Sequence, residues 1–237
     1  MKKAGLASSA WTDLPDRAVT VVIPLGSIEQ HGPHLPLDTD GRIAGEAARR
    51  AVEHVSEEGE DAVLAPTVPY GASGEHEGFP GTISIGSDAL ERQLVEIGRS
   101  ACRWASRVVF VNGHGGNGGA LLAAVDLLRY EGRDVAWYPC AFPNADGHAG
   151  ATETAVLLAF SPGEVRMDAA VPGNTQPIGA LMTRLRSEGV RAVSENGVLG
   201  DPTRADAADG GVQLDGLVGR LSAALRRWRV LDDGRLG

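Results

Sequence analysis

The chain has 237 residues, of which 43% are hydrophobic and 22% are charged, as in an ordinary globular protein. Its formal net charge of −9 and its lack of a basic run argue against nucleic-acid binding. No segment is long and apolar enough to cross a bilayer, and the first residues lack the apolar core of a signal peptide. We therefore expect a cytoplasmic protein with neither a nucleic-acid nor a membrane partner.

Apolar residues recur with spacings that predict alternating strands and helices. The predicted strands are Thr20–Leu25, Ala62–Val68, Arg107–Val111 and Asp134–Tyr138. The predicted helices are Arg42–Val55, Asp88 to about Ala105, Gly118–Tyr130, Thr152–Phe160, Ile178–Ser187 and Val212–Arg229. Asp88 is the expected N-cap of the second helix, because Glu91 completes a capping box. This alternation favours an α/β fold with a mostly parallel sheet and helices on both faces. No linker divides the chain, so we expect one domain over residues 1–237.

Polar clusters follow the predicted strands at their carboxyl ends, where ligands bind in open α/β sheets. The first runs from Glu29 to Asp40 and directly follows a buried strand. Carboxylate oxygen and imidazole nitrogen are ligands that Zn²⁺, Mn²⁺ and Fe²⁺ share. In an extended chain Glu29 and His31 point to the same side, and Asp40 can fold back over them. This cluster therefore predicts a metal site.

Glycine-rich connections carry the other clusters. His114 ends the third strand among four glycines, which let backbone approach a ligand closely, so it is a candidate ligand or catalytic residue. His148 precedes the helix that carries Glu153, and both could face the same cleft; the alternative for Glu153 is a residue that stabilises the helix N-terminus. His34, between two prolines, is interpreted as structural, and His54, beside a glutamate on a charged helix, as a surface residue.

Four segments, taken in this order, resemble the creatininase family of metal-dependent amidohydrolases: GSIEQHGPHLPLDTD, GASGEHEGFPGTIS, NGHGGN and HAGATETA. The resemblance implies a three-layer α/β/α sandwich with a mostly parallel sheet and a homo-oligomer, often a hexamer. It implies one or two divalent ions per subunit, Zn²⁺ or Fe²⁺, with Mn²⁺ as a further candidate. By position, the implied metal ligands are Glu29, His31, Asp40 and His114, with Asp40 bridging, and His148 lies beside the attacked bond.

The chain departs from the creatinine-hydrolysing members of the family at two places. Those members carry a glutamate two residues after the equivalent of His114, where this chain has Gly116. One ligand of a second metal is therefore absent, and Glu153 is the candidate replacement. They also carry a pocket tryptophan shortly before the histidine of HAG, where this chain reads Asn144-Ala145-Asp146. Creatinine itself is therefore not the expected substrate.

The segment from Pro172 to Gly211 is similar to the branch of the family found in mycofactocin biosynthesis clusters. That branch implies a peptidase that trims a ribosomally made, modified precursor peptide and releases a C-terminal dipeptide. His148 would donate a proton to the departing nitrogen in this reaction. The expected substrate-binding residues are Ser73, Glu75, His76, Gly115 and Gly116. A peptide carboxylate would need a cation, for which Arg166, Arg191 and Arg204 are candidates.

Two alternatives remain open at this point. One is a small-molecule cyclic-amide or formamide hydrolase of the same family, such as a creatinine amidohydrolase or a formamidopyrimidine deformylase. The other is a metal-binding protein without catalysis, against which the carboxylate-rich site with open metal positions argues.

Overall fold

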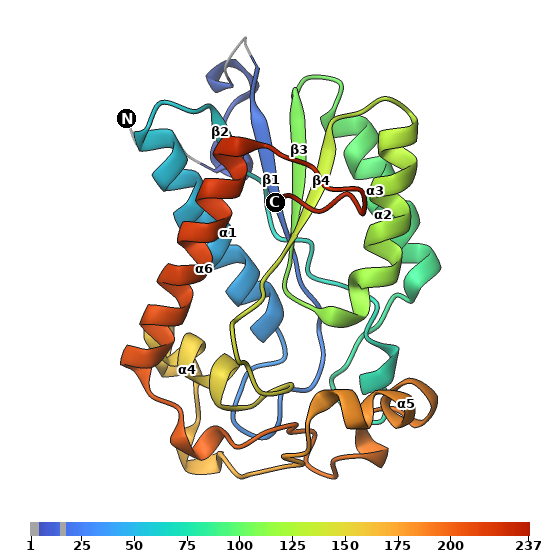
Figure 1. Cartoon of the computed structure of the whole chain (residues 1–237), viewed down its shortest axis with the longest axis vertical. Helices are drawn as coiled ribbons and strands as arrows, with labels where there is room; N and C mark the ends of the chain where they lie inside the picture. The colour runs from blue at the N-terminus through green and yellow to red at the C-terminus, as the bar shows by residue number, and fades with distance from the viewer. Residues whose placement is uncertain (1–4, 15–17) are drawn as a thin grey trace.

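The computed structural model describes residues 5–14 and 18–237. Its central sheet is formed by β1 (Thr20–Leu25), β2 (Ala62–Leu64), β3 (Arg107–Asn112) and β4 (Val135–Pro139). All the strand pairs are parallel, and the spatial order is β2-β1-β3-β4 (Figure 1). The two central strands consist almost entirely of buried residues, as expected of a parallel sheet that is covered on both faces.

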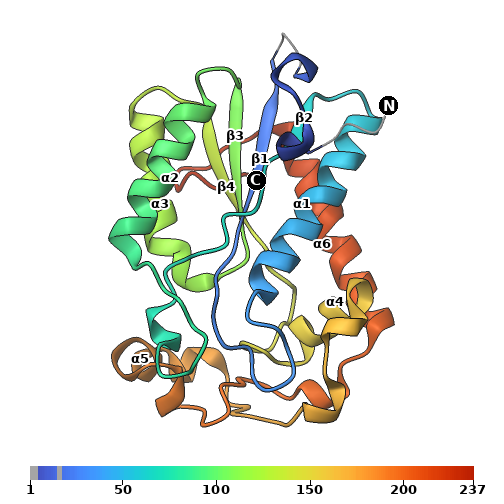
Figure 2. The ribbon, with the colours of Figure 1, turned by 180° about the vertical axis from the view of Figure 1, so that it is seen from behind.

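Helices cover both faces of this sheet, which makes the fold a three-layer α/β/α sandwich (Figures 1 and 2). Successive strand side chains point to opposite faces, so Val21, Ile23 and Leu25 pack in one core cluster and Val22 in another. The first cluster includes apolar residues of α2 (Ser87–Ala101) and α3 (Gly118–Tyr130). The second includes those of α1 (Thr39–Glu57) and α6 (Ala207–Arg227).

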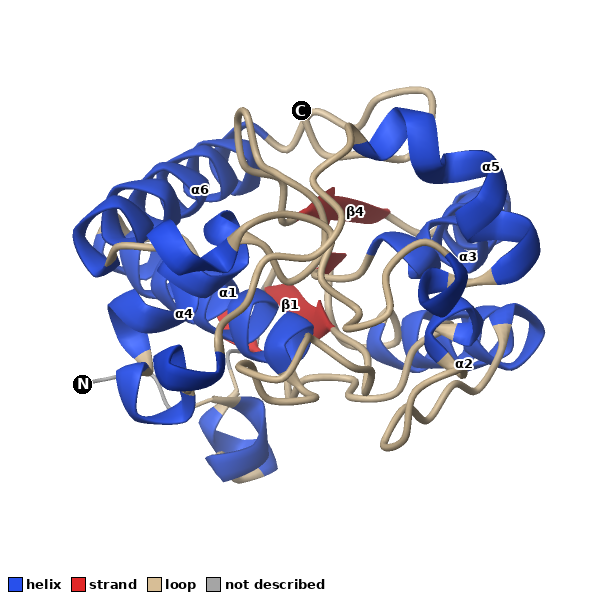
Figure 3. Cartoon of the chain, turned by 90° about the horizontal axis from the view of Figure 1, so that it is seen from below, coloured by secondary structure: helices blue, strands red, loops and turns tan. Residues whose placement is uncertain are grey.

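The remaining helices lie beyond the carboxyl ends of the strands. Figure 3 looks onto this end of the molecule, where α4 (Ala151–Phe160) and α5 (Ile178–Glu188) stand on opposite sides. Loops fill the space between them, together with short 3₁₀ helices that include Gly74–His76 and Gly115–Asn117. Within the described part of the chain, no helix is long and apolar enough to cross a membrane.

The predicted elements are all present, with differences at their ends. The second strand is shorter than expected, because β2 stops at Leu64 and Val68 forms only an isolated bridge with Leu25. The second helix begins at Ser87 and ends at Ala101. Its predicted N-cap was wrong, because Gly86 holds that position with a φ of 76°.

The last helix also begins earlier than predicted. Its N-cap is Asp206, whose Oδ1 accepts hydrogen bonds from the backbone N–H groups of Ala208 and Asp209 at 2.8 and 3.2 Å. The sequence did not predict a helix here because the following pair Gly210-Gly211 has a low helix propensity. Gly210 lies within α6 because it packs against α4: a side chain there would meet the carbonyl oxygen of Ala155 at 1.9 Å.

The assignment of Asp206, and not Asp88, as a helix N-cap can be tested. Asp206→Ala removes two charge-assisted hydrogen bonds from the start of α6, so we expect a loss of about 1 kcal/mol in the free energy of unfolding. Asp88→Ala is the matched control, because the structure gives Asp88 no capping bond; its expected loss is about 0.5 kcal/mol or less. Urea denaturation of the three proteins measures both values. An equal loss in both variants would contradict the assigned cap.

Candidate metal and catalytic site

The candidate site lies where β1 and β3 end side by side, with Leu25 opposite Asn112. The strand order departs in opposite directions from this pair, and such a switch point forms a crevice at the carboxyl edge of the sheet. Two glycines allow the start of α1 to approach both strand ends. A Cβ on Gly26 would lie 2.5 Å from the Cα of Gly41, and one on Gly113 would lie 2.4 Å from the carbonyl oxygen of Asp40.

Asn117 joins three of the connections that leave the sheet. Its buried amide nitrogen donates to the carbonyl oxygen of Gly26 at 2.9 Å and to Oδ1 of Asn112 at 3.1 Å. Its amide oxygen accepts from the N–H of Ala72 at 2.8 Å. The loops after β1, β2 and β3 are therefore held in fixed positions relative to one another.

Asp40 lies between two histidines at the centre of the site. Its Oδ1 is 3.2 Å from Nε2 of His31, and its Oδ2 is 3.3 Å from Nδ1 of His114. The same nitrogen of His114 is 3.1 Å from Oε2 of Glu29. All four side chains are buried. The four residues expected to be metal ligands are thus brought together around one carboxylate, which also accepts a 2.6 Å hydrogen bond from the hydroxyl of Ser27.

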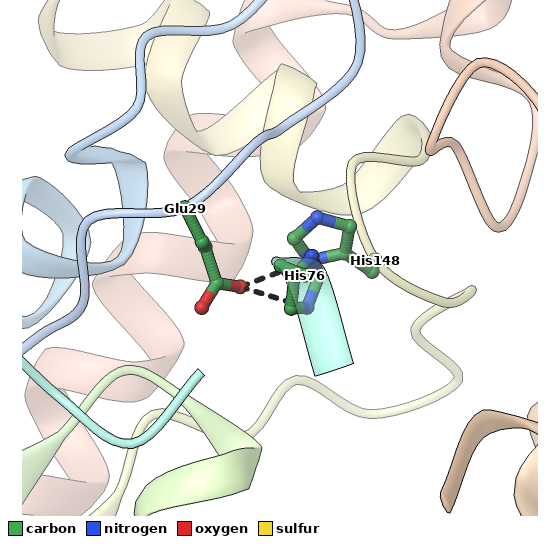
Figure 4. Close-up of side chains that lie close together, drawn as sticks. All are labelled: Glu29, His76 and His148. Atoms are coloured by element: carbon green, nitrogen blue, oxygen red, sulfur yellow. Dashed lines mark ion pairs between the residues drawn. The ribbon is translucent and has the colours of Figure 1, made fainter. Parts of the chain in front are cut away.

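Two further histidines face the other oxygen of Glu29. Figure 4 shows His76 and His148 beside Oε1, with His76 Nε2 at 3.2 Å and His148 Nδ1 at 3.6 Å. His76 was expected among the substrate-binding residues from the sequence. In the structure its buried ring packs against Glu29 and makes ring contacts with His114 and His148.

Hydrogen bonds from one short segment decide which ring nitrogens are free. Nδ1 of His31 lies 3.1 Å from the carbonyl oxygen of Glu29, and Nε2 of His148 lies 2.6 Å from that of Gln30. Each of these nitrogens donates its proton to a carbonyl, which leaves His31 Nε2 and His148 Nδ1 facing the carboxylates of Asp40 and Glu29. The side-chain amide of Gln30 donates to Nδ1 of His76 at 3.0 Å.

Burial and charge act against each other on the ionisable groups. Burial lowers the pKa of His31, but the charge and hydrogen bond of Asp40 together with the charges of Glu153 and Glu29 raise it to about 9. Burial likewise raises the pKa of Asp40, yet the adjacent His31 and His114 hold it well below its usual range. Burial lowers the pKa of His148 to about 4 and raises that of Glu153 to about 7. The raised pKa of His31 shows that positive charge is favoured beside the carboxylates.

The donor set fits one or two divalent cations. Among the described residues, both carboxylate oxygens of Glu29 and Nε2 of His114 are buried without a hydrogen-bond partner, which is costly for polar atoms away from water. Ligand atoms gather within 4.8 Å of one another in three groups: Glu29, His31 and Asp40; His31, His148 and Glu153; Glu29, His76 and His148. Carboxylate oxygens and imidazole nitrogens of this kind suit zinc, manganese or iron.

The side chain of Glu153 contacts the backbone and is also part of the cluster of possible ligands. Its Oε2 accepts a 2.7 Å hydrogen bond from the N–H of Ala149, a residue with the unusual φ of 55°. This contact stabilises the turn that follows His148. Both interpretations of Glu153 from the sequence, as a ligand and as a helix-terminus residue, are compatible with its position.

A large cleft opens above this cluster, with a volume of about 1010 Å³. Of the residues predicted to bind substrate, Glu75, His76, Gly115 and Gly116 line it. Ser73 is fully buried and does not line the cleft.

The far wall of the cleft comes from α5 and the segment after it, including Met182, Leu185, Arg186 and Arg191. Of the three arginines proposed from the sequence, only Arg191 lines the cleft, and its Nη1 donates to the carbonyl oxygen of Gly78 at 2.6 Å. Arg166 instead donates to the carbonyl oxygen of Pro33.

Several residues of the site were missed by the sequence analysis. Ser27, Gln30 and Asn117 act through contacts with distant residues, and Arg186 reaches the cleft from α5. Their position in the sequence could have indicated them, because Ser27 and Gln30 lie inside or beside the first motif and Asn117 lies in NGHGGN. His54 is exposed on α1, as interpreted from the sequence. His34 is buried, with Nε2 2.9 Å from the hydroxyl oxygen of Thr154.

The parallel sheet and its edge of buried carboxylates and imidazoles define a three-layer α/β/α protein with a donor set for a divalent metal. A family model for creatinine amidohydrolase matches residues 7–225, and the chain belongs to this creatininase family. Its members hydrolyse C–N bonds, and so does this enzyme.

Two relatives and one solved structure show how the chain stands within the family. It is 57% identical over 234 residues to the mycofactocin precursor peptide peptidase of Mycolicibacterium smegmatis, covering 98% of this chain and 95% of that protein. It is 30% identical over 181 residues to the creatinine amidohydrolase of Pseudomonas putida, covering 64% and 68%. A mutant creatininase of the Zn-Zn type superimposes with a TM-score of 0.80 at 25% identity, covering 96% and 98%.

Removal of a central side chain is expected to remove the metal. Asp40→Ala and His114→Ala each delete a donor from the buried cluster, so we expect neither variant to retain stoichiometric metal or hydrolytic activity. His54→Ala is the control, since its exposed ring lies on the outer part of α1, and it should retain both. Elemental analysis after dialysis measures the metal. Full occupancy in the Asp40 variant would contradict the site.

Alanine substitutions of His148 and Glu153 are expected to have different effects on kcat and on metal content. His148→Ala should lower kcat while the metal content stays unchanged, because the ring is proposed to act on protons. Glu153→Ala should lower the metal content as well, because Gly116 leaves the second metal position short of a carboxylate that Glu153 would supply. Circular dichroism checks that both variants remain folded. Unchanged metal content in the Glu153 variant would show that Glu153 is not a ligand and acts only through its hydrogen bond to Ala149.

Proposed function

We propose that this enzyme is a metal-dependent peptidase that removes a C-terminal dipeptide from a modified ribosomal precursor peptide. The relative that is 57% identical over nearly the whole chain and named for this kind of substrate supports the proposal. Proposed metal ligands are Glu29, His31, Asp40, His114 and Glu153. Zn²⁺ or Fe²⁺ is the proposed cofactor, with Mn²⁺ as a further candidate, at one or two ions per subunit; solved creatininases of a Zn-Zn type and with Mn support a divalent ion.

The observation that carries the proposal is the size and lining of the cleft. A volume of about 1010 Å³ is at the upper limit of small-molecule pockets, which span roughly 300–1,000 Å³. The rim beside His148 is formed by small or polar residues, Ala145, Asp146 and Gly147, where a tryptophan would close over a flat ring. An extended peptide end therefore fits this cleft better than creatinine does.

When bound, a divalent metal lowers the pKa of a coordinated water and polarises the substrate carbonyl. Around that chemistry the chain supplies proton transfer and orientation. His148 is unprotonated at neutral pH, because burial lowers its pKa to about 4. Its Nδ1 is free, since Nε2 donates to the carbonyl oxygen of Gln30. Nδ1 accepts the proton of the attacking water and then donates it to the departing amide nitrogen.

Gly115 and Gly116 supply backbone donors on the other side of the reacting carbonyl. Both line the cleft at the start of a 3₁₀ helix, where N–H groups lack partners within the helix. Such groups can stabilise the negative charge that develops on the carbonyl oxygen. Gly115 has no atom within 4 Å of an added Cβ, so a substrate backbone can approach it closely.

The substrate can be tested directly. Metal-loaded enzyme incubated with the modified precursor peptide should release a C-terminal dipeptide, detected by mass spectrometry, whereas creatinine should remain unchanged. Chelation should abolish the cleavage, and Zn²⁺ or Fe²⁺ should restore it. Rapid hydrolysis of creatinine beside an intact peptide would overturn the peptidase and favour a small-molecule amidohydrolase.

A further inference from the structure

His114 uses its two ring nitrogens differently. Nδ1 faces Oε2 of Glu29 and Oδ2 of Asp40, at 3.1 and 3.3 Å. Nε2 points the other way, is buried, and makes no hydrogen bond within the described residues. Oε1 of Glu75 lies 3.4 Å from it. An imidazole that binds a cation through one nitrogen carries its proton on the other, and that proton needs an acceptor.

Glu75 reaches His114 only because residue 116 is a glycine. A Cβ on Gly116 would lie 2.5 Å from Oε1 of Glu75 and 2.3 Å from Nε2 of His114. It would also lie 2.6 Å from the carbonyl oxygen of Ala72, so moving the two side chains alone would not relieve the clash. The space beside the imidazole is therefore filled by a carboxylate from a different loop.

The loop that carries Glu75 is held in place by the C-terminal half of the chain. Gly189, with a φ of 79°, passes so close that its Cβ would lie 2.9 Å from the carbonyl oxygen of Glu75. Arg191 donates to the carbonyl oxygen of Gly78 and stacks over Phe79 with its guanidinium 5.4 Å from the ring centre. These contacts fix the 3₁₀ helix Gly74–His76 against the cleft.

The carboxylate of Glu75 is suited to accept this proton. Its side chain is 31% exposed, which is far less costly for a charge than full burial. Its Oε1 faces the buried Nε2 of His114 at 3.4 Å. A carboxylate in this position is an acceptor for a charge-assisted hydrogen bond.

We propose that Glu75 is a positioning residue: it accepts the Nε2 proton of His114 and so fixes Nδ1 toward the cation position shared with Glu29 and Asp40. This inference rests on the proposed function in one respect, namely that a divalent ion binds there. It gives Glu75 a role different from the substrate contact expected from the sequence. It also gives Gly116 a role, as the residue whose missing side chain admits the acceptor.

The test measures affinity for Zn²⁺ alone, by competition with a chromophoric chelator, in the absence of any substrate. Glu75→Ala removes the acceptor, and loss of such an outer partner typically costs about 10–100-fold in metal affinity. Glu75→Gln keeps the shape and an acceptor oxygen but loses the charge, and charged hydrogen bonds are about twice as strong as neutral ones. We therefore expect a smaller loss, of several fold. Glu77→Gln, an exposed neighbour in the same loop, is the matched control and should bind like the unaltered chain.

A second readout reports on geometry. In the Co²⁺-loaded protein the visible absorption bands should shift in Glu75→Gln and remain unchanged in Glu77→Gln, since only the first alters the orientation of a ligand. If a folded Glu75 variant binds Zn²⁺ within twofold of the unaltered chain and raises only KM, Glu75 contacts the substrate and the positioning role is overturned. Absence of Zn²⁺ and Co²⁺ binding in the unaltered chain would instead overturn the proposed metal chemistry, so the two failures are distinguishable.

Discussion

Two carboxylates buried side by side set the main constraint on this structure. Glu29 is 0% exposed and Asp40 is 3% exposed, and each buried ion costs several kcal/mol unless it is paired. The polar groups around the two carboxylates offset this cost. Four histidine rings, those of His31, His76, His114 and His148, face the two carboxylates. The high pKa of His31 and the low pKa of Asp40 both express the same need for positive charge, which a divalent ion meets more fully than protons do.

The sheet makes this concentration of charge possible by bringing distant segments together. Glu29 and Asp40 follow β1, whereas His114 follows β3, and these strands are neighbours at the switch point of the sheet. Contact between their ends is close because Gly113 carries no side chain against the backbone of Asp40. Rigid placement matters here, since a ligand or catalytic group that moves by an ångström loses much of its effect. The amide of Asn117 supplies part of that rigidity.

The sequence predicts those parts of the site that depend on short-range pattern. The strand Thr20–Leu25 and the helix Gly118–Tyr130 are found with the predicted bounds, because a buried apolar run and a periodic apolar face are local signals. The start of α6 was missed because Gly210 is retained for packing against α4, a tertiary reason that overrides propensity.

Three of the five proposed ligands, Glu29, His31 and Asp40, are identifiable because they lie within twelve residues. The contact of His76 with Glu29 joins residues 47 positions apart, and no local pattern specifies it. Glu75 beside His114 is a similar case. Its position follows from the bare backbone of Gly116 and from the clamp that Gly189 and Arg191 place on its loop.

The segment Glu29–His31 organises the site through its backbone as well as its side chains. The carbonyl oxygen of Glu29 accepts a hydrogen bond from His31 Nδ1, and that of Gln30 accepts one from His148 Nε2. Which nitrogen of each ring remains free is thus decided by main-chain geometry, which a change of side chain alters little. The amide of Gln30 also donates to His76 and to the carbonyl oxygen of Gly197, and its oxygen accepts from Gly32. One extended stretch therefore supplies a carboxylate and an imidazole, and it also orients two further imidazoles that come from other loops.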